Sequence, residues 1–226
     1  DISKLNILNE ELRSTGDVIA EENAIMDAEN KIREENIKVQ QQSKLYDEIA
    51  RTLKPKLDKL NGLLSDPPGD EESFRELMKY SCVLNAYIKR FSNLLILSAS
   101  SRHISSEELR LSFAESFEYI SLMGIEAHMD WELNEYLPIE TALILYEFFE
   151  AVLDISMVGM KALLVEMSAD GSEIRLNMQI VDPRKVIAYE KTKKYLLNTN
   201  YNIEIAFDEE EKTEYISFGI KRNGYL

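Results

Sequence analysis

Two carboxylates in the middle of the chain are spaced to act together. The apolar segment that follows Pro138 predicts a buried helix, and this helix carries Glu150 and Asp154 four residues apart. Four residues are about one helical turn, so both side chains point from one face toward a common site. An aspartate at such a site could ligate Mg²⁺. The alternative is that Glu140, Glu147 and this pair form the one polar stripe of an otherwise apolar helix.

Other catalytic and metal-binding arrangements have little support. The chain has two histidines, His103 and His128, and one cysteine, Cys82. Neither histidine belongs to a metal-ligand spacing, and one Cys with two His cannot make a structural zinc site. Nucleophilic catalysis by Ser-His-Asp or Cys-His is allowed by the counts, but no local pattern supports it. A lone cysteine excludes an intrachain disulfide and fits a reducing compartment, and we expect Cys82 to be buried on a helix.

The N-terminal quarter of the chain predicts one long helix with a repeating apolar stripe. Seven-residue spacing places such a stripe against a partner helix, so we expect residues 1–45 to form a coiled-coil signalling helix. Pro55 predicts a kink near Arg51 to Leu53, because proline removes a helical hydrogen bond. The stripe comprises two series, Leu5, Leu12, Ile19 and Met26, then Ile25, Ile32, Val39, Tyr46, Leu53 and Leu60.

Residues 46–100 predict a helical hairpin. Asp66–Asp70 reads Asp-Pro-Pro-Gly-Asp, the clearest loop in the chain, and a second helix is predicted over Glu71–Ser98. Two helices joined by so short a loop pack antiparallel, and two such hairpins would form a dimeric four-helix bundle. The apolar face predicted for the second helix comprises Phe74, Leu77, Met78, Leu84, Tyr87, Ile88, Phe91, Leu94 and Leu95.

After a small polar linker, Ser98 to His103, residues 101–226 predict an α+β sandwich with its helices on one face of a sheet. A helix is predicted from Ser105 or Ser106 to Leu122. The remaining predicted elements are a strand at Ile125–Trp131, a helix at Pro138–Ile155, strands at Lys161–Met167 and Glu173–Val181, a helix at Ala188–Leu197, and strands at Tyr201–Phe207 and Thr213–Lys221. The overall fold class is therefore mixed.

The segment from Ile49 to Leu57 resembles the phosphoacceptor helix of sensor histidine kinases, which reads roughly Ile-Ala-Arg-Glu-Leu-His-Asp-x-Leu. The scaffold positions that match are Ile49, Ala50, Arg51, Leu53 and Leu57. Lys54 occupies the phosphoacceptor position, and Pro55 occupies the acidic position after it. A lysine ammonium does not accept phosphate as an imidazole does. The resemblance therefore implies no catalytic residue; the alternative is that Lys54 is a solvated position on the outer face of a coiled coil.

The order of elements from His103 onward is similar to the ATP-binding domain of histidine kinases, the GHKL or HATPase fold. That resemblance implies a degenerate nucleotide site, with Glu150 and Asp154 in the first motif, where Asn is usual at the second position, and Asp182 as the adenine-binding aspartate. Pro183 and Arg184 follow Asp182 where the family has glycines, and no glycine-rich lid precedes Ala188. We therefore expect no cofactor, or Mg-ATP if the nucleotide site survives, and no resident metal.

The leading hypothesis is the cytoplasmic part of a degenerate sensor histidine kinase, a pseudokinase that signals by conformational change and partner binding. The alternatives are a divergent active histidine kinase of a two-component system and a non-enzymatic coiled-coil adaptor. Expected partners are a second copy of the chain and another kinase or a response regulator; a net charge of −15 argues against nucleic acid. No apolar run approaches the roughly 18 residues that span a bilayer, and the start at Asp1 suggests a piece of a longer protein. We expect a cytoplasmic location, with the soluble part of a membrane-anchored protein as the alternative.

Overall fold

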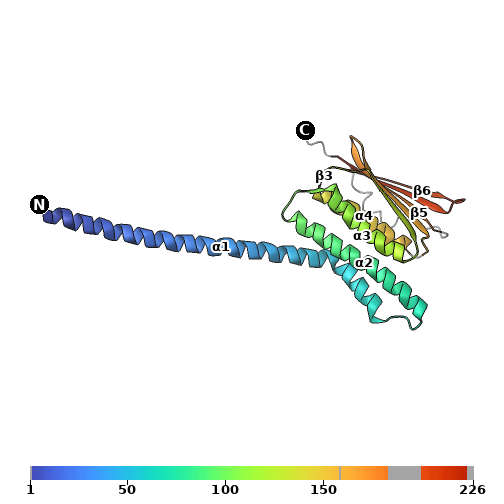
Figure 1. The fold of residues 1–226 in the computed structure, drawn as a ribbon, viewed down its shortest axis with the longest axis horizontal. Coiled ribbons are helices and arrows are strands. Elements are labelled where there is room, and N and C mark those ends of the chain that lie inside the picture. The colour runs from blue at the N-terminus through green and yellow to red at the C-terminus, as the bar shows by residue number, and fades with distance from the viewer. Residues whose placement is uncertain (1, 158, 183–199, 223–226) are drawn as a thin grey trace. The chain divides into compact units, whose positions relative to one another are not determined.

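The computed structural model describes residues 2–157, 159–182 and 200–222 (Figure 1). The chain divides into two compact units, Asp1–Arg51 and Thr52–Leu226. The first unit is the larger part of helix α1 (Ile2–Ser65), and the second contains the end of α1 and all other elements. The mixed fold class, a long helix followed by a helix-and-sheet domain, is confirmed. The predicted boundaries at 45/46 and 100/101 stay predictions.

Helix α1 confirms the predicted long helix, and it runs through Pro55 without ending. Proline in a helix interior leaves one carbonyl without its hydrogen bond, here the carbonyl of Arg51. Arg51 is also the last residue of the first unit. The kink predicted near Arg51 to Leu53 stays a prediction, since the two units are described separately.

Helix α2 (Glu71–Ser98) has the predicted bounds. Asp70 caps it, because its side chain accepts a hydrogen bond of 2.8 Å from the backbone N–H of Ser73. The predicted apolar face is confirmed for Leu84, Tyr87, Phe91 and Leu94, which are buried. Two of its members behave differently: Phe74 and Met78 are 43% and 38% exposed. These two lie in the first turns of α2, and the buried stretch begins only at Ser81.

The sheet of the second unit has five strands in the order β2-β4-β5-β7-β6. Strand β2 (Glu126–Trp131) pairs parallel with β4 (Ala162–Ala169), and the other neighbours pair antiparallel. The predicted hairpins are confirmed: β4 and β5 (Glu173–Val181) flank the turn at Asp170, and β6 (Tyr201–Asp208) and β7 (Thr213–Lys221) flank the acidic turn.

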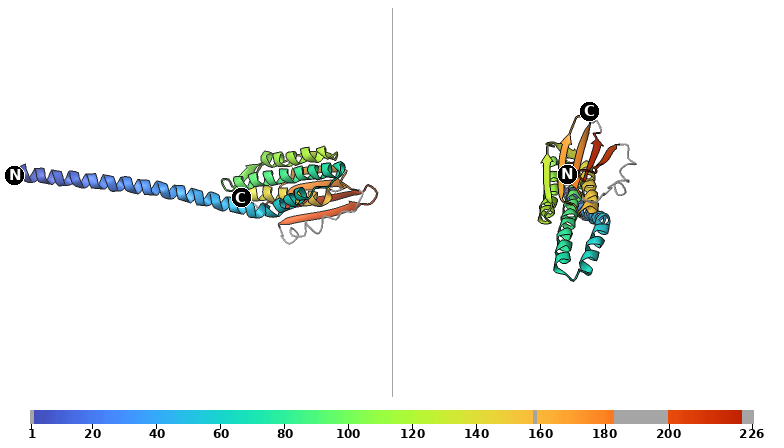
Figure 2. Two further views of the ribbon diagram at one scale, coloured as in Figure 1. Left: turned by 90° about the horizontal axis from the view of Figure 1, so that it is seen from below. Right: turned by 90° about the vertical axis from the view of Figure 1, so that its right-hand side faces the viewer.

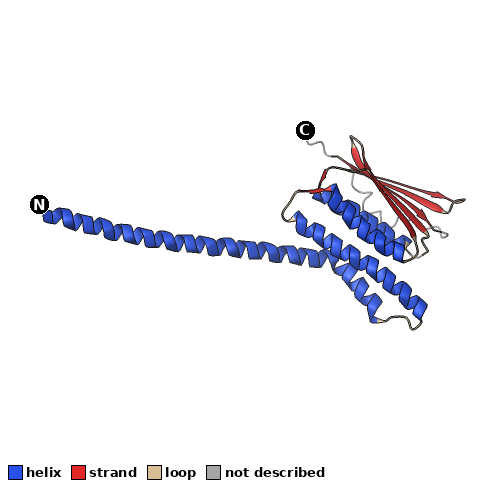
Figure 3. Cartoon of the chain, viewed as in Figure 1, coloured by secondary structure: helices blue, strands red, loops and turns tan. Residues whose placement is uncertain are grey.

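Helices α3 (Ser106–Leu122) and α4 (Ile139–Ser156) cover one face of this sheet (Figures 2 and 3). Ser105 caps α3, and Gly124, at φ 82°, follows its end. Phe148 of α4 stacks on Phe218 of β7 with 4.0 Å between ring centroids. Helix α2 packs on the outer side of α3 and α4, so three layers follow one another: α2, then α3 with α4, then the sheet.

Two further strands, β1 (His103–Ser105) and β3 (Tyr136–Pro138), were not predicted. They pair antiparallel, with Ile104 opposite Leu137, and both of these side chains are buried. The residues assigned to a linker therefore end in a strand that holds α3 and α4 together at their first turns. Two predictions lie outside the described residues. They are the helix at Ala188–Leu197 and the absence of a glycine-rich lid after Asp182.

Candidate functional site

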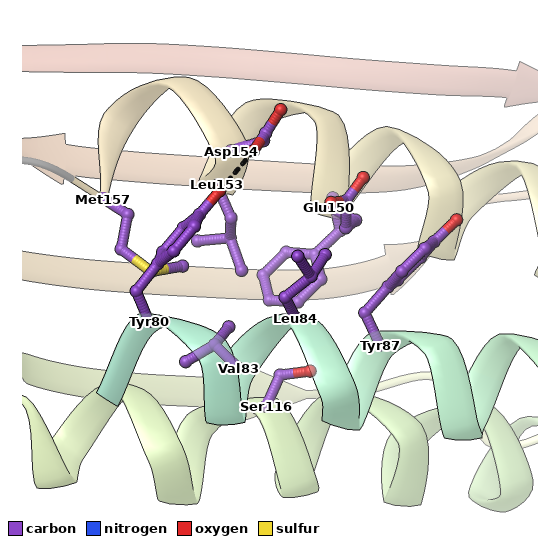
Figure 4. A pocket seen from close by; sticks show the side chains of 10 residues that line it. Tyr80, Val83, Leu84, Tyr87, Ser116, Glu150, Leu153, Asp154 and Met157 are labelled. Carbon is purple, nitrogen blue, oxygen red and sulfur yellow. Dashed lines mark hydrogen bonds between the residues drawn. The ribbon is translucent and has the colours of Figure 1, made fainter. Parts of the chain in front are cut away.

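Helix α4 positions Glu150 and Asp154 on the flank that faces the helical hairpin. The other flanks of α4 are occupied by rings: Phe148 contacts the sheet, and Phe149 stacks on Phe113 of α3 at 4.4 Å. Figure 4 shows Tyr80 of α2 reaching the carboxylate of Asp154 from the opposite helix. The two carboxylates lie on one face of α4, as predicted. This face contacts α1 and α2, the two helices of the hairpin.

Two lysines from the end of α1 are the charged partners of these carboxylates. Lys56 Nζ donates to Glu150 Oε1 and lies 3.8 Å from Asp154 Oδ2. Lys59 Nζ donates to Asp154 Oδ1. The carboxylate side chains are only 10% and 7% exposed, so each is largely removed from water. Among the described residues, two ammonium groups therefore face two carboxylates.

Tyrosines of α2 complete the cluster. Tyr80 Oη donates a hydrogen bond of 2.6 Å to Asp154 Oδ1 and accepts one from Lys59 Nζ. Lys59 Nζ also lies 5.0 Å from the centre of the Tyr80 ring, and Lys56 Nζ lies 5.7 Å from that of Tyr87. Both are cation–π distances. The five residues Lys56, Lys59, Tyr80, Glu150 and Asp154, here called the ionic cluster, therefore join three helices.

Burial raises the pKa of two members of the cluster, Glu150 and Tyr80. The pKa of Glu150 is raised above its ordinary value, mainly by burial, although the charge and hydrogen bond of Lys56 oppose this. The pKa of the Tyr80 phenol is raised, first by burial and then by its hydrogen bond to Asp154. Tyr80 therefore stays protonated at physiological pH and acts as a hydrogen-bond donor. The arrangement suits structural ion pairing, and the phenol is a poor proton acceptor there.

The space beside the cluster is small. A cavity of about 10 Å³ is lined by the apolar parts of Val83, Leu84 and Leu153 together with the cluster residues Tyr80, Glu150 and Asp154 (Figure 4). This is about the volume needed for the centre of one water molecule. A nucleotide does not fit there unless the hairpin helices move away from α4.

Asp182, the third predicted nucleotide-site residue, lies at the end of β5. It is 2% exposed, and its backbone N–H donates to the carbonyl of Lys212 at 3.0 Å. It continues the buried positions Met178 and Ile180, every second residue along β5, so it occupies the face of the sheet that α4 covers. Its role as an adenine-binding residue stays a prediction.

The remaining sequence candidates lie at the surface. Lys54, at the predicted phosphoacceptor position, has a side chain that is 73% exposed, and its Nζ lies 3.8 Å from Asp58 Oδ2. His103 in β1 and His128 in β2 are exposed, while Cys82 is half-buried rather than buried. Among the described residues, no group of three or more His, Cys, Asp or Glu side chains could hold a metal ion. No described helix is both long and apolar enough to cross a membrane.

Sequence reasoning missed three members of the ionic cluster, Lys56, Lys59 and Tyr80. Lys56 and Glu150 are 94 residues apart in the chain, so no local pattern joins them. The signal that could have found the lysines is the helical phase of α1. Lys56 and Lys59 follow the buried Leu53 by three and six residues and lie on the side of α1 that faces the interior of the second unit. Lys54 lies on the exposed side of the helix.

Comparison with solved structures returns histidine kinase domains. No protein-family model and no curated protein matches the sequence. The histidine kinase domain of a blue-light-activated kinase from Erythrobacter litoralis is similar at 10% identity and a TM-score of 0.48, covering 76% of this chain and 95% of that domain. The histidine kinase AdeS of Acinetobacter baumannii has 12% identity and a TM-score of 0.43, covering 76% and 98%.

A third match is a bacterial phosphotransferase with 15% identity and a TM-score of 0.42, covering 80% of this chain and 95% of that one. The kinase ThkA, in a structure with the response regulator protein TrrA, is also similar, at 12% identity and a TM-score of 0.42, covering 80% and 61%. Three of these four proteins are histidine kinases, the family that the sequence resemblance indicated. All the TM-scores lie below 0.5, so the function proposed next rests on this chain's own residues.

Proposed function

We propose that this chain is the cytoplasmic part of a degenerate sensor histidine kinase, which transmits a signal by conformational change and protein binding without phosphotransfer. The observation that carries the proposal is the pairing of Glu150 and Asp154 with Lys56 and Lys59. In an ATP site these acids would face Mg²⁺ and phosphate. Here two lysines of the same chain already balance their charge, and the hairpin helices cover them.

Two features of the sequence support the same function. Lys54 replaces the phosphoacceptor histidine of the family motif, and its side chain is 73% exposed. Pro183 and Arg184 replace glycines after Asp182, and neither residue type readily adopts the positive φ angles that glycine supplies. A triphosphate would therefore lack the backbone N–H groups that normally hold it.

The proposed partners are proteins. A second copy of the chain pairs through the apolar stripe of α1 and the hairpin, and the output partner is another histidine kinase or a response regulator. A coiled-coil dimer gives a route for the signal, because a change in helix packing at one end moves the helices at the other. The second unit then presents its surface to the partner in a changed arrangement.

Titration of the purified chain with Mg-ATP tests this function. We expect no heat of binding by calorimetry at nucleotide concentrations up to about 1 mM, the upper end of typical enzyme KM values, and no label from radioactive ATP. The variant Lys54→His should also stay unlabelled, because restoring the histidine does not restore the nucleotide site. Micromolar binding that is lost in Asp182→Ala, together with labelling of the chain, would instead identify a divergent active kinase.

A further inference from the structure

The end of α1, which belongs to the second unit, has one fully buried apolar side chain. Among the residues that α1 contributes to this unit, from Thr52 to Ser65, Leu53 is the one fully buried hydrophobic side chain, at 3% exposure. Leu60 and Leu63 are half-buried, and Leu57 and Leu64 are 39% and 45% exposed. Helix α2 differs, because seven of its residues are buried. The ionic cluster supplies the described hydrogen bonds and ion pairs between this part of α1 and α4.

An attachment made of ion pairs opens differently from an apolar core. Separating apolar side chains exposes them to water and costs free energy in proportion to their area. Separating Lys56 and Lys59 from Glu150 and Asp154 returns four charges to water, and their hydration offsets most of the lost attraction. The closed and open forms are therefore close in free energy, as a two-state element requires. The α2–α4 layer keeps its own core in both forms.

The position of Pro55 connects this cluster to the first unit. Pro55 leaves the carbonyl of Arg51, the last residue of the first unit, without a helical hydrogen bond. Lys56 directly follows Pro55. A helix bends most readily at such a point. A change in the bend at Pro55 therefore changes the orientation of the turn that carries Lys56 and Lys59.

We propose that the ionic cluster is a reversible latch, which holds residues 52–65 of α1 against α4 and opens when the preceding part of α1 moves. Opening exposes the carboxylates of Glu150 and Asp154 and the hydroxyl of Tyr80, while α2, α3, α4 and the sheet stay folded. The assignment of this latch to signalling rests on the proposed function. The opening and closing of the latch are independent of that function, since they depend only on the contacts of the five residues of the ionic cluster.

Hydrogen exchange of the full chain, followed by mass spectrometry, tests the latch. In the double variant Lys56→Met/Lys59→Met, peptides from residues 53–65 should exchange at least ~10-fold faster than in the wild type, because local opening governs their protection. Peptides of β4 and β5 should stay within about twofold. Lys54→Met is the matched control, since it removes an exposed lysine from the same helix, and it should match the wild type throughout.

Two results would overturn the latch. One is unchanged exchange of residues 53–65 in the double variant; the other is equal acceleration in β4 and β5, which would make this segment part of the cooperative core. If the double variant does not fold, the wild type at about 0.1 M and 1 M NaCl serves instead. Faster exchange confined to residues 53–65 at high salt supports the latch, and no response to salt contradicts it. Binding of Mg-ATP by the same sample would contradict only the proposed function.

Discussion

At the scale of single residues, three lysines within one short stretch of α1 have different surroundings. Lys54 is exposed, whereas the side chain of Lys56 is 23% exposed and that of Lys59 is 37% exposed. The difference follows from the helix, in which each residue turns by about 100° relative to the one before. Lys54 attracts attention in the sequence, but Lys56 and Lys59 make the interactions with α2 and α4.

The substitution Lys56→Met should destabilise the protein more than Lys54→Met. It leaves the buried carboxylate of Glu150 without its main partner, and we expect a loss of about 2–3 kcal/mol, at or below the range for a fully buried pair. Lys54→Met should change stability by less than about 0.5 kcal/mol, as is usual at exposed positions. Urea unfolding followed by circular dichroism measures both values.

A second substitution separates charge from packing in this comparison. Glu150→Gln removes the charge that Lys56→Met leaves unpaired, so the double variant Lys56→Met/Glu150→Gln should recover at least half of the lost stability. If the double variant is instead less stable than Lys56→Met alone, the lysine acts through its aliphatic stem and the ion pair contributes little.

The sequence predicted part of this site. The four-residue spacing of Glu150 and Asp154 correctly indicates that their carboxylates converge, because both approach Lys56 Nζ. The spacing says nothing about what they converge on. Lys59 and Tyr80 come from two other helices, and pairing across such distances in the chain depends on packing that no local pattern encodes.

At the scale of elements, α2 is fixed to its neighbours on two sides. On one side, Tyr80 belongs to the ionic cluster with α4. On the other, Lys89 donates to Glu115 of α3 at 2.8 Å, and Arg90 donates to the second oxygen of the same carboxylate. Between these, Tyr87 lies 5.4 Å from Tyr146 of α4, centre to centre. A helix predicted to belong to a separate hairpin is therefore also the outer layer of the C-terminal sandwich.

Because Glu115 contacts α2 as a carboxylate, the free energy of unfolding should decrease at acid pH. Burial alone would raise the pKa of Glu115, but the hydrogen bonds from Lys89 and Arg90 outweigh it and hold this pKa below its ordinary value. The unfolded chain then binds the proton first as pH falls. The stabilisation is therefore complete above the unfolded pKa, about 4.3, and is lost as pH falls through the folded pKa.

The variant Glu115→Gln measures this effect. At pH 6–8 it should be less stable than the wild type by roughly 1 kcal/mol, and the difference should shrink below about pH 4.3. Glu118→Gln on the same helix is the control, since Glu118 is exposed, and it should show a small difference at every pH. A constant difference for Glu115→Gln down to pH 3 would show that its contact with α2 does not depend on charge.

Most elements could be predicted because their patterns are local. The capping residue Asp70, the period of α4 and the alternation of β5 each lie within one segment, and the predicted bounds agree closely with the observed ones. Strands β1 and β3 could not be predicted in this way. Each has three residues, too few for alternation to be recognised. Each is defined by a tertiary contact, the pairing with a strand more than thirty residues away in the chain.

At the scale of the whole molecule, the apolar stripe of α1 has no described partner within the first unit. Its described residues are large and hydrophobic, and each is more than half exposed: Leu12, Ile19, Ile25, Met26, Ile32, Val39 and Tyr46. A solitary helix cannot bury such a stripe by itself. The seven-residue spacing fits a second identical helix, which is why self-association is part of the proposed function.

Breaking this stripe should dissociate the dimer without unfolding the second unit. Ile32 and Val39 are 59% and 63% exposed in the single chain and seven residues apart, so both would be buried in a coiled coil. In Ile32→Asp/Val39→Asp, four aspartates would face one another across the dimer, and like charges at such positions are strongly unfavourable when desolvated. Light scattering during size-exclusion chromatography should give the mass of a dimer for the wild type and of a monomer for this variant.

The control for this experiment carries the same added charge on the opposite side of the helix. Asn30→Asp/Gln41→Asp changes two exposed polar residues about half a turn away from the stripe, so it should remain dimeric. The thermal unfolding of all three proteins should share the transition of the second unit, because its core lies outside the first unit. A monomeric wild type, or a dimer that survives in Ile32→Asp/Val39→Asp, would mean that α1 does not join two copies through this stripe.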